Sequence, residues 1–224
     1  MASLRFRLRQ EYWALRAPRQ MKNYLADTPI PKLQIGSGHN LLKGWLNTTL
    51  YPIEPGAVFL DARRPFPMPA ESLDYIFSEH VIEHLEFEEA MAMLCECKRA
   101  LKPGGRIRIA TPDLKQIIAL YAQPDGEEQA RYIRWIMRTF RPKFGEFSPA
   151  HAVNQSFHGW RHKFIYDELT LRQALKDTGF QSITRVEPGE SEDEQLRGLE
   201  QHGSYVGNEG AMRYETMVFE ATKP

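Results

Sequence analysis

Short apolar segments alternate with longer amphipathic segments from about residue 32 to the C-terminus. Rich in Leu, Ile, Val, Phe and Tyr, the short segments predict strands. They lie in KLQIGSGHN, GWLNTTL, GAVFLDA, SLDYIF, RIRIATP, FQSITRV and YETMVFEAT. Helical spacing predicts helices over 87–102 and 167–178, and one or two more within 113–140. Strands that alternate with helices and end in two strands joined by a loop predict an α/β chain, with a mostly parallel sheet and helices on both faces.

Residues 1–30 stand apart as a predicted basic amphipathic helix before the main domain, 31–224. The expected apolar stripe is Leu4, Leu8, Tyr12 and Leu15, with Arg5, Arg7, Arg9 and Arg16 around it. Pro18 is expected to end or break this helix. Two interpretations of residues 3–24 stay open: a helix packed on the domain, or a contact with an anionic lipid or phosphate-rich surface.

Composition is that of an ordinary globular chain with 224 residues, 42% of them apolar. Lys plus Arg and Asp plus Glu both number 29, so we expect no binding of duplex nucleic acid. Cys95 and Cys97 are two residues apart in a predicted helix and cannot readily pair, which favours a reducing compartment. With no apolar segment long enough to span a membrane and no secretory signal, we expect a cytoplasmic protein.

The segment SEHVIEHL contains the spacing H-x-x-E-H at His80, Glu83 and His84. On a helix these side chains would share one face, as in zinc hydrolases that hold the metal with two histidines. A third ligand could come from His151, His158 or His162. The alternative is that these residues are hydrogen-bonded structural groups at a strand end.

Two glycines, Gly36 and Gly38, follow the first predicted strand, and Asp61 ends the third. Glycines at a strand end allow a ligand to approach the backbone closely, and a carboxylate there can accept from an exocyclic amino group. Each signal alone is weak, because glycine often marks only a turn and Asp only a cap.

Together these segments resemble the class I S-adenosylmethionine-dependent methyltransferases, and most closely a branch of small bacterial-type members with GSGxN, GWLN and SEHxxEHL. The resemblance runs from about residue 32 to 112, and its carriers are LQIGSGHN, LDARRPFPMPAESLDYIFSEHVIEHL and CKRALKPGGRIRIATPDL. It implies a Rossmann-like fold with a seven-stranded sheet, and S-adenosylmethionine as the cofactor. We interpret residues 113–166, rich in aromatic residues and histidine in their second half, as a helical and loop lid.

The resemblance also implies roles for individual residues. The glycine loop Gly36, Ser37 and Gly38 would run past the methionine and ribose parts of the cofactor. Asp61 and Ala62 would contact adenine, and Glu79 and His80 would border cofactor and acceptor. Two departures from the family pattern concern the glycine loop and the second strand. In the glycine loop, Gln34 stands in place of an acid and Asn40 in place of a small residue. At the end of the second strand, Thr49 stands in place of the usual ribose-binding acid, a role in which Glu54 could compensate.

We therefore predict a methyltransferase acting on a hydroxyl or amine of a small-molecule or glycan-like acceptor. Such an acceptor has to lose a proton, so a base is needed. The candidates are His84, His80 and, from the lid, His158 or His162. We expect catalysis without a metal. The alternatives are a protein of this fold that binds the cofactor or a nucleotide without methyl transfer, and a zinc hydrolase using H-x-x-E-H.

Overall fold

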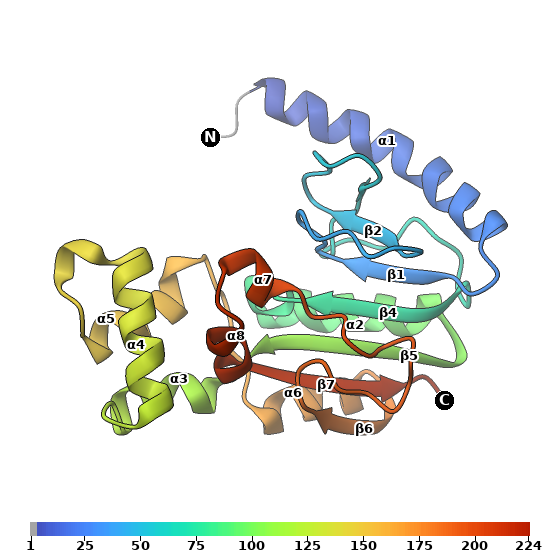
Figure 1. Cartoon of the computed structure of the whole chain (residues 1–224). Coiled ribbons are helices and arrows are strands. Elements are labelled where there is room, and N and C mark those ends of the chain that lie inside the picture. Colours follow the sequence, from blue (N-terminus) through green and yellow to red (C-terminus); the bar gives the residue numbers. More distant parts are fainter. Residues whose placement is uncertain (1–3) are drawn as a thin grey trace.

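The centre of the chain is a seven-stranded sheet (Figure 1). The computed structural model describes residues 4–224, with side chains from Arg9 onward. The strands are β1 (Lys32–Ile35), β2 (Leu46–Thr49), β3 (Val58–Phe59), β4 (Leu73–Glu79), β5 (Leu101–Pro112), β6 (Gln181–Val186) and β7 (Thr216–Thr222). Their order is β3-β2-β1-β4-β5-β7-β6. Strand β7 runs antiparallel to β5 and β6, and all the other pairs are parallel. The predicted Rossmann-like, mostly parallel sheet is confirmed.

Helices and short helical turns connect the strands. They are α1 (Leu4–Asp27), η1 (Ile82–His84), α2 (Phe87–Ala100), α3 (Leu114–Ala122), α4 (Glu127–Phe140), η2 (Pro142–Phe144), α5 (Pro149–Asn154), η3 (Gln155–Gly159), α6 (Glu168–Asp177), α7 (His202–Val206) and α8 (Glu209–Glu215). The predicted helices within 87–102, 113–140 and 167–178 are all present. Sequence reasoning missed α7 and α8, since helices this short carry little apolar periodicity.

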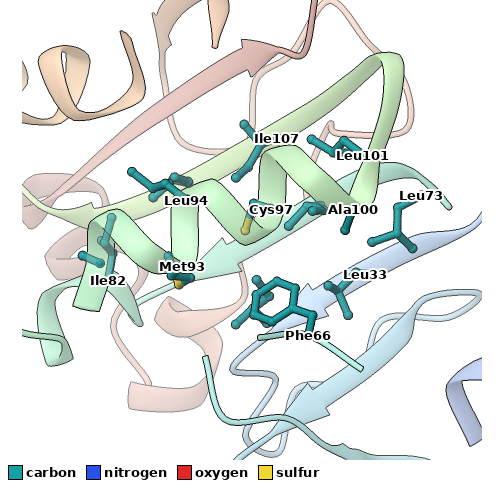
Figure 2. Packing of buried hydrophobic residues seen from close by; sticks show 14 of the residues in the cluster. Leu33, Phe66, Leu73, Ile82, Met93, Leu94, Cys97, Ala100, Leu101 and Ile107 are labelled. Carbon is teal, nitrogen blue, oxygen red and sulfur yellow. The ribbon is translucent and has the colours of Figure 1, made fainter. Parts of the chain in front are cut away.

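Helix α2 fills the core beside β4 and β5. A capping box at Glu86 and Glu89 starts it, with the Glu86 amide donating to Glu89 Oε2 at 3.1 Å. Its buried face includes Met93, Leu94 and Cys97, which Figure 2 shows in one cluster with core residues of the strands. Cys97 is buried and Cys95 exposed, and both are free thiols, as their spacing predicts.

The N-terminal helix α1 lies along the β3 edge of the sheet (Figure 1). The prediction that Pro18 ends or breaks it is wrong. Pro18 lies inside the helix without ending it, because Ala17 and Met21 on either side are both buried against the core. Tyr12 and Leu15 of the expected apolar stripe are 53% and 82% exposed, so this part of the stripe does not pack on the domain.

The remaining expectations about this helix concern its first residues and its contact with a membrane or an anionic surface. The stripe residues Leu4 and Leu8 and the arginines Arg5 and Arg7 lie outside the described side chains. None of the described helices, α1 included, is both long and apolar enough to cross a membrane. Contact with an anionic surface through residues 3–24 stays a prediction.

A buried ion network ties the loop after β6 to the sheet. Arg108 on β5 is fully buried and donates to Glu200 at 2.6 and 3.0 Å and to Glu220 at 2.6 Å. It also donates to the Glu190 carbonyl at 2.8 Å, and Glu200 accepts from the Gly189 amide at 2.9 Å. Residues 189–200 are thereby fixed over the sheet, immediately before α7.

The helices α3, α4 and α5 gather beyond the end of the sheet where β4 and β5 terminate (Figure 1). They form a second apolar cluster with α8, made of Leu120, Tyr132, Ile133, Ile136, Met137, Ala152, Ala211 and Tyr214. The predicted lid, 113–166, therefore stands over the carboxyl ends of the parallel strands, where ligands bind in open α/β sheets. That it opens and closes stays a prediction.

Candidate active site

One cavity of about 460 Å³ opens at the carboxyl ends of β1 and β4. Its walls come from the loop after β1, the segment after β4, the lid, and the C-terminal helices α7 and α8. The lining residues are Gln34, Gly36, Ser37, Gly38, His39, Asn40, Glu79, His80, His84, Pro112, Trp135, Phe140, Trp160, His162, His202, Tyr205, Val206 and Glu215. Five of the seven histidines in the sequence lie in this wall.

The glycine loop forms the first wall. Gly36 and Gly38 have φ of +76° and +51°, a backbone region that side chains disfavour. A Cβ on Gly36 would lie 2.1 Å from Val81 Cγ2, whereas one on Gly38 would meet nothing within 4 Å. The Ser37 amide donates to the Thr48 carbonyl at 2.8 Å and so ties the loop to β2. The predicted loop residues therefore present bare backbone to the cavity, which fits a cofactor held at close range.

Three other predicted cofactor residues, Thr49, Asp61 and Ala62, lie at neighbouring strand ends and do not line the cavity, whereas Glu79 and His80 do. Thr49 ends β2, and Asp61 and Ala62 follow β3. Asp61 accepts from Arg63 Nε and Nη2, both at 2.8 Å. Burial opposes ionisation of Asp61, but Arg63 outweighs burial and lowers the pKa of the carboxyl group. Contact of these residues with adenine stays a prediction.

Glu54, the residue expected to compensate for Thr49, reaches the glycine-loop side of the cavity through a histidine. Its Oε1 lies 2.6 Å from His39 Nδ1, and His39 lines the cavity. The carboxylate is therefore close to the loop, as a substitute for the missing acid requires.

The H-x-x-E-H segment is not one helix, so the predicted shared face is wrong. His80 has φ of +50°, and its amide donates to the Ala110 carbonyl at 2.9 Å, which keeps it tied to β5. Only Ile82–His84 form a helical turn, of the 3-10 type. His80 stacks on His202 with ring centroids 4.1 Å apart, whereas His84 lies against His162 at 4.8 Å. The zinc hydrolase arrangement, with His80 and His84 on one ion, is therefore not formed.

Glu83 is the buried centre of this segment. It is fully buried, with Oε1 3.0 Å from His80 Nδ1 and Oε2 accepting from Thr111 Oγ1 at 3.0 Å. Burial opposes charge on both partners, but their mutual attraction outweighs it. The pKa of His80 rises to about 9 and the pKa of Glu83 falls to about 2. Glu83 thus fixes the orientation of the His80 ring.

Glu79 holds the start of α7, which contributes His202 to the cavity wall. Its carboxylate accepts from the backbone amides of Gln201 at 3.1 Å and His202 at 3.0 Å, which begins α7. Burial raises the pKa of Glu79 despite these hydrogen bonds. Burial, together with the charge on His80, lowers the pKa of His202 to about 3.

His202 and Glu215 are site residues that sequence reasoning missed. Glu215 is buried, accepts from the Tyr132 hydroxyl, and has a pKa raised chiefly by burial. His202 begins α7 and Glu215 ends α8, and both lie more than 120 residues after Glu79. No local motif marks them, so only the fold brings them to the cavity.

Of the lid histidines, His162 lines the cavity and the predicted His158 does not. His162 Nδ1 lies 2.6 Å from the Ser156 carbonyl oxygen. Because a carbonyl only accepts, Nδ1 carries the hydrogen, and Nε2 of the neutral ring has a free lone pair. Burial lowers the pKa of His162, so the ring is neutral near pH 7. His158 is exposed.

Aromatic side chains of the lid form the outer wall. Trp135 meets Phe140 edge-on at 5.5 Å, and Phe140 meets Trp160 in the same way at 5.1 Å. These rings exclude water from the space in front of His162, which lies 5.7 Å from Trp160.

Comparison with known families shows that the part of the chain carrying two of these walls is similar to one family. Residues 35–109 match the family model described as "Methyltransferase domain". The matched segment runs from the end of β1 into β5 and so contains the glycine loop and the segment from Glu79 to His84. This match supports S-adenosylmethionine as the cofactor and methyl transfer as the activity.

Solved structures share the fold over nearly the whole of this chain. A SAM-dependent methyltransferase from Archaeoglobus fulgidus is similar with a TM-score of 0.50 and 18% identity, over 96% of this chain and 94% of that one. Phosphoethanolamine N-methyltransferase 2 from Haemonchus contortus, with phosphomonomethylethanolamine and S-adenosylhomocysteine, has a TM-score of 0.50 and 16% identity. That match covers 91% of this chain and 53% of the Haemonchus chain. A sequence search of curated proteins finds no match.

Proposed function

We propose that this chain transfers a methyl group from S-adenosylmethionine to a hydroxyl or amine of a small-molecule or glycan-like acceptor. The observation that carries the proposal is that the glycine loop lines one cavity together with several histidines and aromatic rings. When bound, the cofactor supplies an electrophilic methyl group. The protein's own residues have to hold the acceptor in line with it and exclude water.

The cavity wall favours a neutral or cationic acceptor. Among the described residues no Lys or Arg lines it, while Glu79 and Glu215 do. Arg161 and Lys163 in the lid lie outside the lining, and Lys163 pairs with Glu86 at 3.1 Å. An anionic acceptor or a nucleic-acid backbone would find no Lys or Arg here, and the charge of His80 is already paired with Glu83. The aromatic wall provides apolar faces for a ring or a sugar.

His162 is the residue best placed to act as the base. Its Nδ1–H is fixed by the Ser156 carbonyl, so Nε2 can accept the proton of an acceptor hydroxyl or amine. His84 lies beside it in the same wall, and His80 is engaged by Glu83. The role expected of His158 therefore passes to His162 in this proposal.

Methyl transfer is tested by incubating purified protein and labelled S-adenosylmethionine with fractionated cell extracts. The proposal expects label in a small-molecule fraction, reduced in Asp61→Ala and His84→Ala. Label found only in nucleic acid or protein would contradict the proposed acceptor class. Cofactor binding with no transfer to any fraction would favour the alternative, a protein of this fold that binds without catalysis.

Alanine substitutions at two glycines distinguish damage to the cofactor site from strain in the backbone. Gly38 and Gly44 both have positive φ, +51° and +82°, and an added Cβ meets nothing within 4 Å at either position. Alanine should therefore strain the backbone by about 1–2 kcal/mol at both. Only Gly38 lines the cavity.

We expect Gly38→Ala to weaken binding of S-adenosylmethionine at least ten-fold by calorimetry, about 1.4 kcal/mol. Gly44→Ala, the matched control, should bind as the wild type does. Equal affinities in the two variants would show that the glycine loop does not contact the cofactor.

A further inference from the structure

A second group of ligands converges at the inner corner of the cavity. His80, His202 and Glu215 each offer one donor atom, and these atoms lie within 4.8 Å of one another. All three residues line the cavity, so the corner is open to a small ligand. Two donors on a common ion at about 2.1 Å are at most about 4.2 Å apart, so only small side-chain rotations separate this trio from coordination.

We propose that His80, His202 and Glu215 bind a divalent first-row transition cation such as Zn²⁺ or Fe²⁺. Two imidazoles and one carboxylate with open positions are a ligand set that suits these ions. The sequence-based expectation of metal-free catalysis is replaced by this proposal. The three ligands come from the end of β4, the start of α7 and the end of α8, and the chain brings them together only on folding.

Each ligand is held by a neighbour in the way that metal ligands usually are. His80 Nδ1 lies 3.0 Å from Glu83 Oε1, and Thr111 donates to the other Glu83 oxygen, so Nε2 is the atom left to bind an ion, which would displace its proton. At 3.4 Å, Nε2 has only a long contact with Thr216 Oγ1. Glu215 accepts from the Tyr132 hydroxyl.

His202, the third ligand, is positioned by a hydrogen bond from its backbone amide. Glu79 Oε1 accepts from the His202 amide at 3.0 Å, which sets the start of α7 and brings the His202 ring against His80. The Arg108 network fixes the chain up to Glu200, immediately before this point.

Charge at this corner also favours a cation. The carboxylates of Glu79, Glu83 and Glu215 surround the His80 ring, and among the described residues no Lys or Arg lines the cavity. Buried acids without a cation are costly, and a divalent ion would offset them.

A rival trio, Glu83, His84 and His162, also has donor atoms within 4.8 Å. It is the weaker candidate because both Glu83 oxygens already face His80 and Thr111. His84 is also exposed. On the proposed function, an ion held by His80, His202 and Glu215 would bind the acceptor oxygen and lower the pKa of its hydroxyl, next to the base His162.

Titration of tag-free, chelator-stripped protein with Co²⁺, followed by visible absorption and calorimetry, tests the site. We expect one Co²⁺ per chain in the wild type. His202→Ala and Glu215→Gln should weaken binding at least 100-fold, and Tyr132→Phe, which removes only the supporting hydroxyl, about ten-fold. His158→Ala, outside the cavity, is the matched control and should bind as the wild type does. Circular dichroism verifies that each variant is folded.

Folded wild-type protein that takes up no Co²⁺ would overturn the site. So would loss of Co²⁺ in His84→Ala with retention in His202→Ala, because the ion would then belong to the rival trio. Calorimetry with S-adenosylmethionine on the same samples separates this proposal from the proposed function. Co²⁺ binding without cofactor binding would refute the function alone, and the converse would refute the metal site alone.

Discussion

Replacing His162 by alanine should lower the rate of methyl transfer about 10²–10⁴-fold, the usual contribution of a positioned general base. The reason is geometric: the Ser156 carbonyl holds Nδ1–H at 2.6 Å, which leaves Nε2 free in a wall of the cavity. Binding of S-adenosylmethionine should be unchanged, since His162 belongs to the lid and not to the glycine loop. Rate and affinity are measured on the same preparation, by labelled transfer and by calorimetry.

Two further readouts distinguish a base from a structural residue. His158→Ala, four residues away and exposed, is the control and should keep the wild-type rate. In the wild type, the rate should fall only as the pH drops below 6.5, because burial lowers the pKa of His162 and a base works unprotonated. If His162→Ala kept both the rate and this acidic limb, His162 would not be the base.

The second large effect is on stability. Arg108→Met should lower the free energy of unfolding by about 3–5 kcal/mol, the usual cost of removing one partner from a buried ion pair. Glu200 and Glu220 are 1% and 4% exposed at their side chains, and Glu200 would lose its cation altogether. Glu220 keeps Arg106 at 2.7 Å. Urea unfolding of both proteins measures the difference.

A surface arginine provides the comparison for Arg108. Arg131→Met breaks an exposed pair with Glu127, at 63% and 87% side-chain exposure, and should leave the urea midpoint unchanged. Adding Glu200→Gln to Arg108→Met should restore part of the lost stability, because one unpaired buried charge is removed. Equal midpoints for Arg108→Met and Arg131→Met would show that the network does not stabilise the fold.

The sheet could be predicted from sequence because its signals are local. The apolar segments and the glycines after β1 each act over a few residues, and they predict the strands and the edge of the sheet that carries the site. The same local logic was wrong at Pro18, where burial of Ala17 and Met21 holds the helix together. It was also wrong at H-x-x-E-H, where the His80 amide remains bonded to β5.

The chemistry of the cavity could be predicted only in part, because its partners are distant in sequence. Glu79, His80 and His84 follow directly from the end of β4, and the prediction that they lie at the site is consistent with their place in the cavity wall. His202 and Glu215 arrive through α7 and α8, and His162 is distinguished from His158 only by its contact with Ser156. None of these contacts has a sequence spacing that a motif could reveal.

The central claim, that this cavity binds S-adenosylmethionine, is tested most directly by calorimetric titration of the wild-type protein. The structure predicts saturable binding at one site per chain for S-adenosylmethionine and for its demethylated product, S-adenosylhomocysteine. Absence of binding by folded protein at millimolar concentrations of both ligands would contradict it.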